Sequence, residues 1–262
     1  MLPYLNVFSH AVPMYSVMAV CGIVLAFIYV WRRSRAYPGA IEADLQLGFI
    51  YGMAGAFVGA KLLSVFTVLP QLIAEFSYLF SDTGAFLQKY LYGGFVFYGG
   101  LYGAVLALWI FAKHVKRDYW QLLAVLLPSL PLVHFMGRLG CFCMGCCYGT
   151  PSRLGIAFSV SPIAPNGIPL FPVQLAEALL VLLLFFLLDY WARIKIDGRR
   201  MLGLYLLIYG CCRFCLEFFR GDDYRGFLGP LSISQVISLI SVFWAIWLLR
   251  RAKRFFASGG ES

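Results

Sequence analysis

The sequence predicts an all-α integral membrane protein with about seven transmembrane helices in one bundle. Of its 262 residues, 61% are hydrophobic and 13% are charged, and the mean hydropathy is +0.81. Soluble globular domains carry about twice that share of charged residues. Long apolar runs recur along the whole chain, and lysines and arginines gather between alternate runs. These observations exclude a soluble protein.

Each predicted span is an apolar run long enough to cross about 30 Å of hydrocarbon. The runs are 13–31, 46–69, 93–112, 120–137, 171–190, 201–220 and 231–249. We expect residues 1–262 to form a single polytopic domain. The first residues contain no Lys or Arg before the first run and no clear cleavage site, so an uncleaved start is expected.

The distribution of the 21 lysines and arginines predicts the orientation of the chain. Fourteen follow the first, third, fifth and last spans, and these are Arg32, Arg33, Arg35, Lys113, Lys116, Arg117, Arg193, Lys195, Arg199, Arg200, Arg250, Arg251, Lys253 and Arg254. The opposite loops hold only Lys89, Arg153 and Arg225. The positive-inside rule therefore places the N-terminus outside and the C-terminus in the cytoplasm. Because the net charge of +9 mostly reflects topology, a nucleic-acid partner is not expected.

Four cations remain inside the apolar stretches, and they are Lys61, Arg138, Arg213 and Arg220. The span directions place them in the outer half of the membrane, together with Glu177 and Glu217. Charges at that depth usually face a partner or a cavity. Arg213, Glu217 and Arg220 follow one helical face at i, i+4 and i+7, so an ion pair within the helix is expected. Two glutamates cannot neutralise four cations, so we predict a phosphate-binding cavity open to the outer leaflet.

Glycines gather at the start of the third span and around the end of the fourth, and they are Gly93, Gly94, Gly99, Gly100, Gly103, Gly137, Gly140, Gly145 and Gly149. Such glycines permit either close helix packing or an irregular backbone that lines a cavity. The sequence alone does not choose between these two interpretations.

The stretch HFMGRLGCFCMGCCYG at 134–149 resembles the signature of the bacterial prolipoprotein diacylglyceryl transferases, approximately G-R-hydrophobic-G-N-F-x-N-x-E-x-x-G. Further matches keep the family order, and they are Tyr15, Gly59-Ala60-Lys61, Gly99-Gly100-Leu101, 172–177, the 213–222 run and Ser234-Gln235. Five polar family positions differ: Tyr98 and Phe171 replace histidines, Cys141 and Met144 replace asparagines, and Cys146 replaces a glutamate.

The resemblance implies that the diacylglyceryl group of phosphatidylglycerol moves to the lipobox cysteine of a lipoprotein precursor, with release of glycerol 1-phosphate. It implies catalytic roles for Arg138, Arg213, Tyr98 and Glu217, and substrate-binding roles for Tyr15, Lys61, Gly99, Gly100, Gln174, Glu177, Cys141, Cys146 and Arg220. The resemblance implies no cofactor or metal, so neither is expected. We expect a monomer in the bacterial inner membrane, with the site facing the outer leaflet.

Two alternatives to that function stay open. One is a divergent paralogue that binds the lipid phosphate through the same basic residues but uses a different acceptor. The other is a non-catalytic lipid-binding or thiol-metal protein. Tyrosine has an ordinary pKa of about 10. Tyr98 is interpreted as the base that deprotonates the acceptor thiol, as a group that orients the reactants, or as a side chain that only lines the site. His134 precedes Arg138 by one turn, and a core position is its expected role.

Seven of the eight cysteines form two clusters, Cys141, Cys143, Cys146 and Cys147, and then Cys211, Cys212 and Cys215. They are interpreted as small buried residues, as disulfide partners on an oxidising side, as ligands of zinc or another thiophilic metal, or as a catalytic Cys146. The loop at about 150–170, rich in Pro, Gly and Ser, is expected to cap the outer mouth. The segment at about 70–92 is expected to be an interfacial arm.

Overall fold

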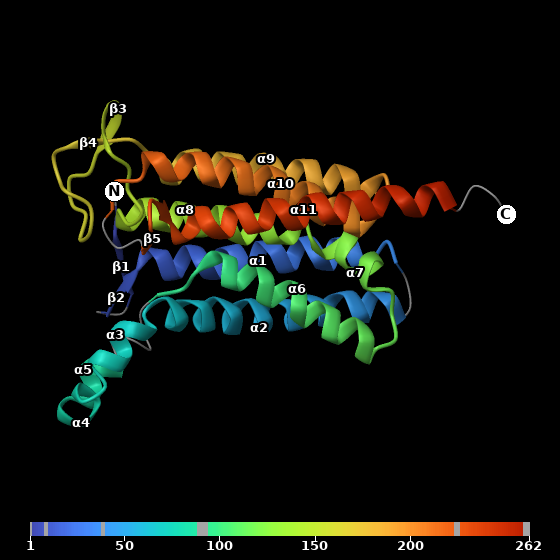
Figure 1. Ribbon diagram of the computed structural model, residues 1–262, viewed down its shortest axis with the longest axis horizontal. Coiled ribbons are helices and arrows are strands. Elements are labelled where there is room, and N and C mark those ends of the chain that lie inside the picture. Colours follow the sequence, from blue (N-terminus) through green and yellow to red (C-terminus); the bar gives the residue numbers. More distant parts are fainter. Residues whose placement is uncertain (1, 8–9, 38–39, 88–93, 223–225, 259–262) are drawn as a thin grey trace. The chain divides into compact units, whose positions relative to one another are not determined.

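The computed structural model describes residues 2–7, 10–37, 40–87, 94–222 and 226–258 (Figure 1). The chain divides into two compact units: Met1–Tyr37 together with Leu123–Ser262 form unit 1, and Pro38–Leu122 form unit 2. Helices dominate both units, which confirms the predicted all-α membrane fold. The expectation of a single polytopic domain stays a prediction.

Unit 1 is built from five long helices: α1 (Met14–Ser34), α8 (Ser129–Met144), α9 (Val173–Arg193), α10 (Gly198–Leu216) and α11 (Ile233–Ser258). α8 packs against α1 and α9, and α10 packs against α9 and α11. The fully buried face of α10 carries Met201, Tyr205, Tyr209 and Arg213, four residues spaced four apart. This spacing keeps one stripe of the helix turned inward.

Three short antiparallel hairpins each lead directly into a helix of unit 1. β1 (Tyr4–Val7) pairs with β2 (His10–Pro13) before α1, β3 (Pro151–Ala157) pairs with β4 (Pro169–Leu170) before α9, and β5 (Phe227–Leu228) pairs with β6 (Leu231–Ser232) before α11. The sequence did not predict these strands. The expected cap loop at 150–170 contains β3 and β4, and its role as a cap stays a prediction.

Contacts between helix ends define the relative directions of three helices of unit 1. Tyr29 Oη, near the end of α1, donates to Asp189 near the end of α9, and Arg193 binds the same carboxylate. At the other end, the contacts of Arg138 with Glu177 join the end of α8 to the start of α9. These contacts show that α1 and α9 run in the same direction and that α8 runs opposite to them, as the predicted crossings require. The side of the membrane that each end faces stays a prediction.

Unit 2 contains α2 (Ala40–Thr67), α3 (Leu69–Ala74), α4 (Tyr78–Ser81), α5 (Thr83–Leu87) and α6 (Phe97–His114). α2 packs on α6 through a glycine pair on each helix, Gly55 and Gly59 on α2 and Gly99 and Gly103 on α6. A Cβ atom on Gly59 would collide with the carbonyl oxygen of Gly99. Close packing therefore accounts for these glycines.

The segment predicted as an interfacial arm contains α3, α4 and α5, with Phe76 and Phe80 exposed. Residues 88–92 of that segment lie outside the described residues. Its contact with the membrane interface stays a prediction.

The number of clear membrane spans is smaller than predicted. Within the described ranges, six helices are long and apolar enough to cross a membrane, and α7 (Tyr119–Leu126) together with α8 counts as one of them. The third predicted span, 93–112, corresponds to α6, which is not among the six. α6 has 18 residues and ends in Lys113 and His114, so its apolar length is short for a full crossing.

Candidate functional site

Two buried glutamates and two arginines form a connected network at one end of unit 1. Arg138 Nη2 on α8 lies 2.8 Å from Glu177 Oε1 on α9. Arg213 Nη2 on α10 lies 2.6 Å from Glu217 Oε2, which confirms the ion pair expected at i, i+4. Arg213 Nε lies 3.9 Å from Glu177 Oε1 and links the two pairs. Both glutamate side chains are about 1% exposed.

A third arginine, Arg220, joins this network through Glu217 and also binds a carboxylate that lies beyond the apolar span. Arg220 donates from Nε and Nη2 to the two oxygens of Asp222, at 2.8 and 2.5 Å, and its Nη1 lies 3.6 Å from Glu217 Oε2. Three arginines therefore meet three carboxylates in unit 1. The predicted surplus of buried positive charge is wrong here, because the sequence argument counted only the two carboxylates inside the apolar spans.

Neutral side chains complete the surroundings of Glu177. Tyr209 Oη donates to Glu177 Oε1 at 2.8 Å. Arg138 Nε donates to His134 Nε2 at 3.3 Å, and this histidine nitrogen lies 3.3 Å from Glu177 Oε1. His134 is buried, as its expected core role requires. Arg213 Nη2 lies 3.4 Å from Ser234 Oγ at the start of α11.

The three arginines differ in accessibility. The side chains of Arg138 and Arg220 are each 11% exposed, whereas that of Arg213 is 4% exposed. Arg213 Nη1 is buried without a hydrogen-bond partner among the described residues. The side chains of Arg138 and Arg220 thus keep a small exposed fraction, while Arg213 lies between the two glutamates.

Backbone pairing fixes the position of Arg220 beside the end of α8. The 3₁₀ turn η2 (Glu217–Phe219) follows α10 and brings the chain to the segment after α8. Thr150 N–H donates to Phe219 O at 2.9 Å, and Gly221 N–H donates to Tyr148 O at 2.9 Å. This pairing holds Arg220 next to the cysteine-rich turn.

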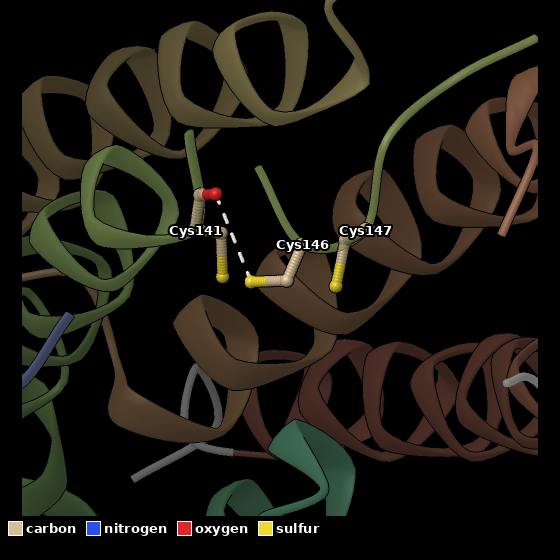
Figure 2. A group of neighbouring side chains, drawn as sticks. All are labelled: Cys141, Cys146 and Cys147. Carbon is tan, nitrogen blue, oxygen red and sulfur yellow. Dashed lines mark hydrogen bonds between the residues drawn. The ribbon is translucent and has the colours of Figure 1, made fainter. Parts of the chain in front are cut away.

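The cysteine-rich turn brings three thiols together, those of Cys141, Cys146 and Cys147 (Figure 2). Their Sγ atoms all lie within 4.8 Å of one another. Cys146 Sγ also donates to Cys141 O at 3.7 Å. All eight cysteines are free, so the structure lends no support to a disulfide. Among the described residues, none of the three cysteines of α10 belongs to this group.

Two residues with positive φ create the turn. Gly145 ends α8 with φ +77°, and a Cβ atom there would collide with Ser161 Oγ. Cys147 also has a positive φ of +56°, a conformation that costs a non-glycine residue about 1–2 kcal/mol. The surrounding contacts must hold this strained backbone in place.

The thiols of the turn differ in acidity. Hydrogen bonds from Cys141 and Cys146, with help from the charges of Arg138 and Arg220, hold the pKa of Cys147 well below its usual value. The hydrogen bond with Cys141 would lower the pKa of Cys146, but the contact with Cys147 and burial raise it to about 12. Cys147 is therefore the thiol of the pair that ionises first.

Two further predicted residues lie beside this turn. Gln174 is buried at the start of α9, and its Nε2 donates to Cys146 O at 2.8 Å. Its Oε1 has no hydrogen-bond partner within the described part of the chain. The backbone of Tyr15 packs against Gly140, two residues after Arg138.

The remaining predicted residues belong to unit 2. Tyr98 is buried and stacks on Tyr102, with ring centroids 6.3 Å apart. Lys61 Nζ lies 5.5 Å from the ring centroid of Phe95. Gly99 and Gly100 face α2, where a side chain would crowd backbone oxygens. Roles for these four predicted residues in catalysis or substrate binding stay predictions.

In unit 1 the structure thus gathers nine of the predicted residues around the network and the turn, namely Tyr15, Arg138, Cys141, Cys146, Gln174, Glu177, Arg213, Glu217 and Arg220. Sequence reasoning did not assign Tyr209, Asp222 or Cys147 to the site. Tyr209 was detectable from its spacing of four before Arg213, and Asp222 from its place two residues after Arg220. Cys147 had no signal beyond its membership of the cysteine cluster.

Comparison with known proteins adds a family to this geometry. Residues 4–251 match the model of a family described as prolipoprotein diacylglyceryl transferase. A Clostridium tetani protein named phosphatidylglycerol–prolipoprotein diacylglyceryl transferase is 35% identical over 236 residues, 89% of this chain and 90% of the relative. A Clostridium perfringens protein named phosphatidylglycerol–prolipoprotein diacylglyceryl transferase 2 is 33% identical, and the match covers 93% of this chain and 92% of the relative. An Idiomarina loihiensis protein with the same name as the Clostridium tetani protein is 32% identical, and the match covers 89% of this chain and 86% of the relative.

Proposed function

This chain belongs to the prolipoprotein diacylglyceryl transferase family and is a transferase, and we propose that it moves the diacylglyceryl group of phosphatidylglycerol to the cysteine thiol of a lipoprotein precursor. In this reaction a C–S bond forms between the thiol sulfur and a glycerol carbon. The bond from that carbon to the phosphate oxygen breaks, and glycerol 1-phosphate leaves with the electron pair. The thiol proton must pass to a base.

The observation that carries the proposal is the pair of partly exposed arginines, Arg138 and Arg220, on a buried network. Glu177 and Asp222 fix the two guanidinium groups through short contacts. Among its described contacts, Arg138 uses Nε and Nη2, so Nη1 remains to donate to a phosphate oxygen. Preorganised donors of this kind stabilise the charge that develops on a departing phosphate.

Arg213 has a positioning role in this proposal. It is buried between Glu177 and Glu217 and contacts both, so it sets the distance between the two ion pairs. The clamp that touches the lipid is then formed by Arg138 and Arg220. Lys61 in unit 2 is kept as an auxiliary cation, and Tyr98 as a candidate base.

The three carboxylates of the network are poor candidates for the base that deprotonates the acceptor thiol. Each is held in a contact with an arginine, and this contact directs its oxygens toward the network instead of toward an incoming thiol. A thiol with an ordinary pKa of about 8.5 needs another group for its activation. The network therefore serves the leaving phosphate rather than the attacking sulfur.

We propose further that the chain works as a monomer in the bacterial inner membrane, with this end of unit 1 at the outer leaflet. The segregation of Lys and Arg to the opposite ends of the helices supports this orientation. Reaction of single-cysteine variants with a membrane-impermeant thiol reagent tests it: Arg153→Cys should be labelled from outside, and Arg199→Cys should not.

The central experiment combines purified protein in phosphatidylglycerol liposomes with a lipobox peptide, and follows peptide mass. We expect the mass to rise by one diacylglyceryl group, and both Arg138→Gln and Arg220→Gln to lose this product. Arg193→Gln is the matched control, since this exposed arginine lies at the other end of unit 1. Thermal unfolding of each variant shows whether it is folded.

Two other results would contradict the proposed function. Consumption of phosphatidylglycerol that depends on Arg138, without a modified peptide, would mean a different acceptor. Lipid binding without any consumption would mean a non-catalytic protein.

A further inference from the structure

The three-thiol group of Cys141, Cys146 and Cys147 is a cluster that the phosphate clamp does not use. The ligand atoms are three sulfurs, and no imidazole or carboxylate joins them among the described residues. A set of thiolates without oxygen ligands suits a thiophilic ion such as Zn²⁺. Hard cations such as Mg²⁺ would require oxygen ligands instead.

The spacing of the sulfur atoms fits such an ion. With Zn–S bonds of about 2.3 Å, tetrahedral geometry places two sulfur ligands about 3.8 Å apart. The Sγ atoms already lie within 4.8 Å of one another, so small rotations of the Cys side chains are enough to close the site. The hydrogen bond from Cys146 Sγ to Cys141 O is given up in this step.

The backbone is arranged to bring the three thiols together. α8 ends at Met144, and the positive φ values of Gly145 and Cys147 turn the chain back toward Cys141. Gln174 Nε2 binds Cys146 O from α9 and holds the turn from the other side. A strained non-glycine residue fixed by such contacts is typical of a functional site.

The charges near the group favour an anionic metal complex. Three thiolates and one Zn²⁺ carry a net charge of −1. Backbone pairing of Thr150 with Phe219 and of Gly221 with Tyr148 holds the cationic Arg220 next to the cysteine-rich turn, and a nearby positive charge offsets that net charge.

The site has room for one more ligand. Three protein ligands leave the fourth tetrahedral position of zinc open, as in catalytic zinc sites. Cys146 and Cys147 are only partly buried, so a small group has access to the ion. Backbone pairing holds Arg220 next to the cysteine-rich turn, so the ion and an arginine of the proposed clamp belong to the same end of unit 1.

We propose that Cys141, Cys146 and Cys147 bind one Zn²⁺, and that the acceptor thiol of the proposed transfer binds the fourth position as a thiolate. The second half of this proposal rests on the proposed function. A hydroxide held on the ion takes the thiol proton and leaves as water. The bound sulfur then attacks the glycerol carbon, the C–O bond breaks toward the phosphate, and the neutral thioether dissociates as a weak ligand.

Metal content tests the site directly. The full chain, purified in detergent, is incubated with Zn²⁺, desalted and measured by inductively coupled plasma mass spectrometry. We expect about one zinc ion per chain, lost in Cys146→Ser and in Cys147→Ser. Cys143→Ser is the matched control, because this partly buried cysteine belongs to the same cluster of the sequence but not to the three-thiol group. Circular dichroism shows whether each variant is folded.

Spectroscopy of the Co²⁺-substituted protein tests the open position without relying on activity. We expect thiolate-to-cobalt absorption that shifts when a lipobox peptide is added, and no shift with the same peptide carrying Ser in place of Cys. Transfer should fall at least tenfold in Cys147→Ser and stay unchanged in Cys143→Ser.

The outcomes separate the two proposals. Wild-type protein without bound zinc, or zinc retained in both Cys146→Ser and Cys147→Ser, would overturn the metal site. A bound ion whose spectrum ignores the peptide, with transfer intact in Cys147→Ser, would overturn its role toward the acceptor. A peptide-sensitive ion without any diacylglyceryl transfer would support the thiol-binding metal site and contradict the proposed function.

Discussion

Arg138 Nη2 on α8 lies 2.8 Å from Glu177 Oε1 on α9, in a contact where the glutamate side chain is about 1% exposed. The same oxygen accepts a hydrogen bond from Tyr209 and is approached by Arg213. One carboxylate therefore joins three helices of unit 1. These contacts fix the position of the Arg138 guanidinium group, which belongs to the proposed phosphate clamp.

Replacing Glu177 by Gln should destabilise the protein by about 3–5 kcal/mol, because it leaves buried arginines without their counter-charge. The measurement is the free energy of unfolding in detergent. Arg193→Gln breaks an exposed i, i+4 pair and should cost only about 0–1 kcal/mol. Equal losses for the two variants would show that the Glu177 network contributes no more than a surface pair.

Arg213→Lys should lower transfer at least tenfold although the charge is kept. The guanidinium contacts Glu177 with Nε and Glu217 with Nη2, and the single ammonium of lysine cannot reproduce that fork. Because Arg213 is buried and acts through the network, we expect kcat to fall more than the KM for phosphatidylglycerol rises. Steady-state kinetics in mixed micelles distinguish this result, and Arg193→Lys should behave like the unchanged chain.

Gly145→Ala should destabilise the turn more than Gly167→Ala does. Both glycines have φ values near +78°, so both substitutions carry the cost of a left-handed backbone, about 1–2 kcal/mol. At Gly145 the new Cβ atom also collides with Ser161, whereas at Gly167 it meets no described atom within 4 Å. Limited proteolysis of residues 150–170 should be faster in Gly145→Ala, and equal rates would contradict the described packing.

In unit 2, Gly59→Ala should separate α2 from α6, because the new Cβ atom would meet the backbone of Gly99, which has no side chain to move aside. We expect a loss of stability of about 1–3 kcal/mol, as for overpacked cores. Gly52→Ala is the control on the same helix, where the Cβ atom meets no atom of the described residues within 4 Å. It should leave stability unchanged or raise it by up to about 1 kcal/mol through helix propensity.

The two neighbouring thiols of the turn should respond differently to pH. In chelator-treated protein, Cys147 should react with iodoacetamide faster than Cys146 at pH about 7, since the thiolate is the nucleophile and the pKa of Cys147 lies below that of an ordinary thiol, about 8.5. Raising the pH should accelerate Cys146 continuously, because its pKa is raised to about 12, while Cys147 changes little. Peptide mass spectrometry after short labelling pulses gives both rates, and a faster Cys146 at neutral pH would refute these directions.

Composition and local spacing were enough to predict much of this protein. Apolar run length predicted the membrane helices, since crossing the bilayer is a local requirement on each segment. The spacing of Arg213 and Glu217 predicted their ion pair, because residues four apart share a helical face. The motif around Arg138 indicated the family, and the structure placed most of the predicted site residues of unit 1 around one network.

Other features depend on contacts between distant segments, and only the tertiary structure decided them. Asp222 neutralises Arg220 because backbone pairing with the segment after α8 holds the chain beyond α10 in place. Cys147 meets Cys141 because two left-handed residues reverse the chain after α8. The sequence by itself determined which charges and thiols lie near the end of each helix. The fold determined which of them touch, because that depends on how helices and turns pack together, a property no local pattern encodes.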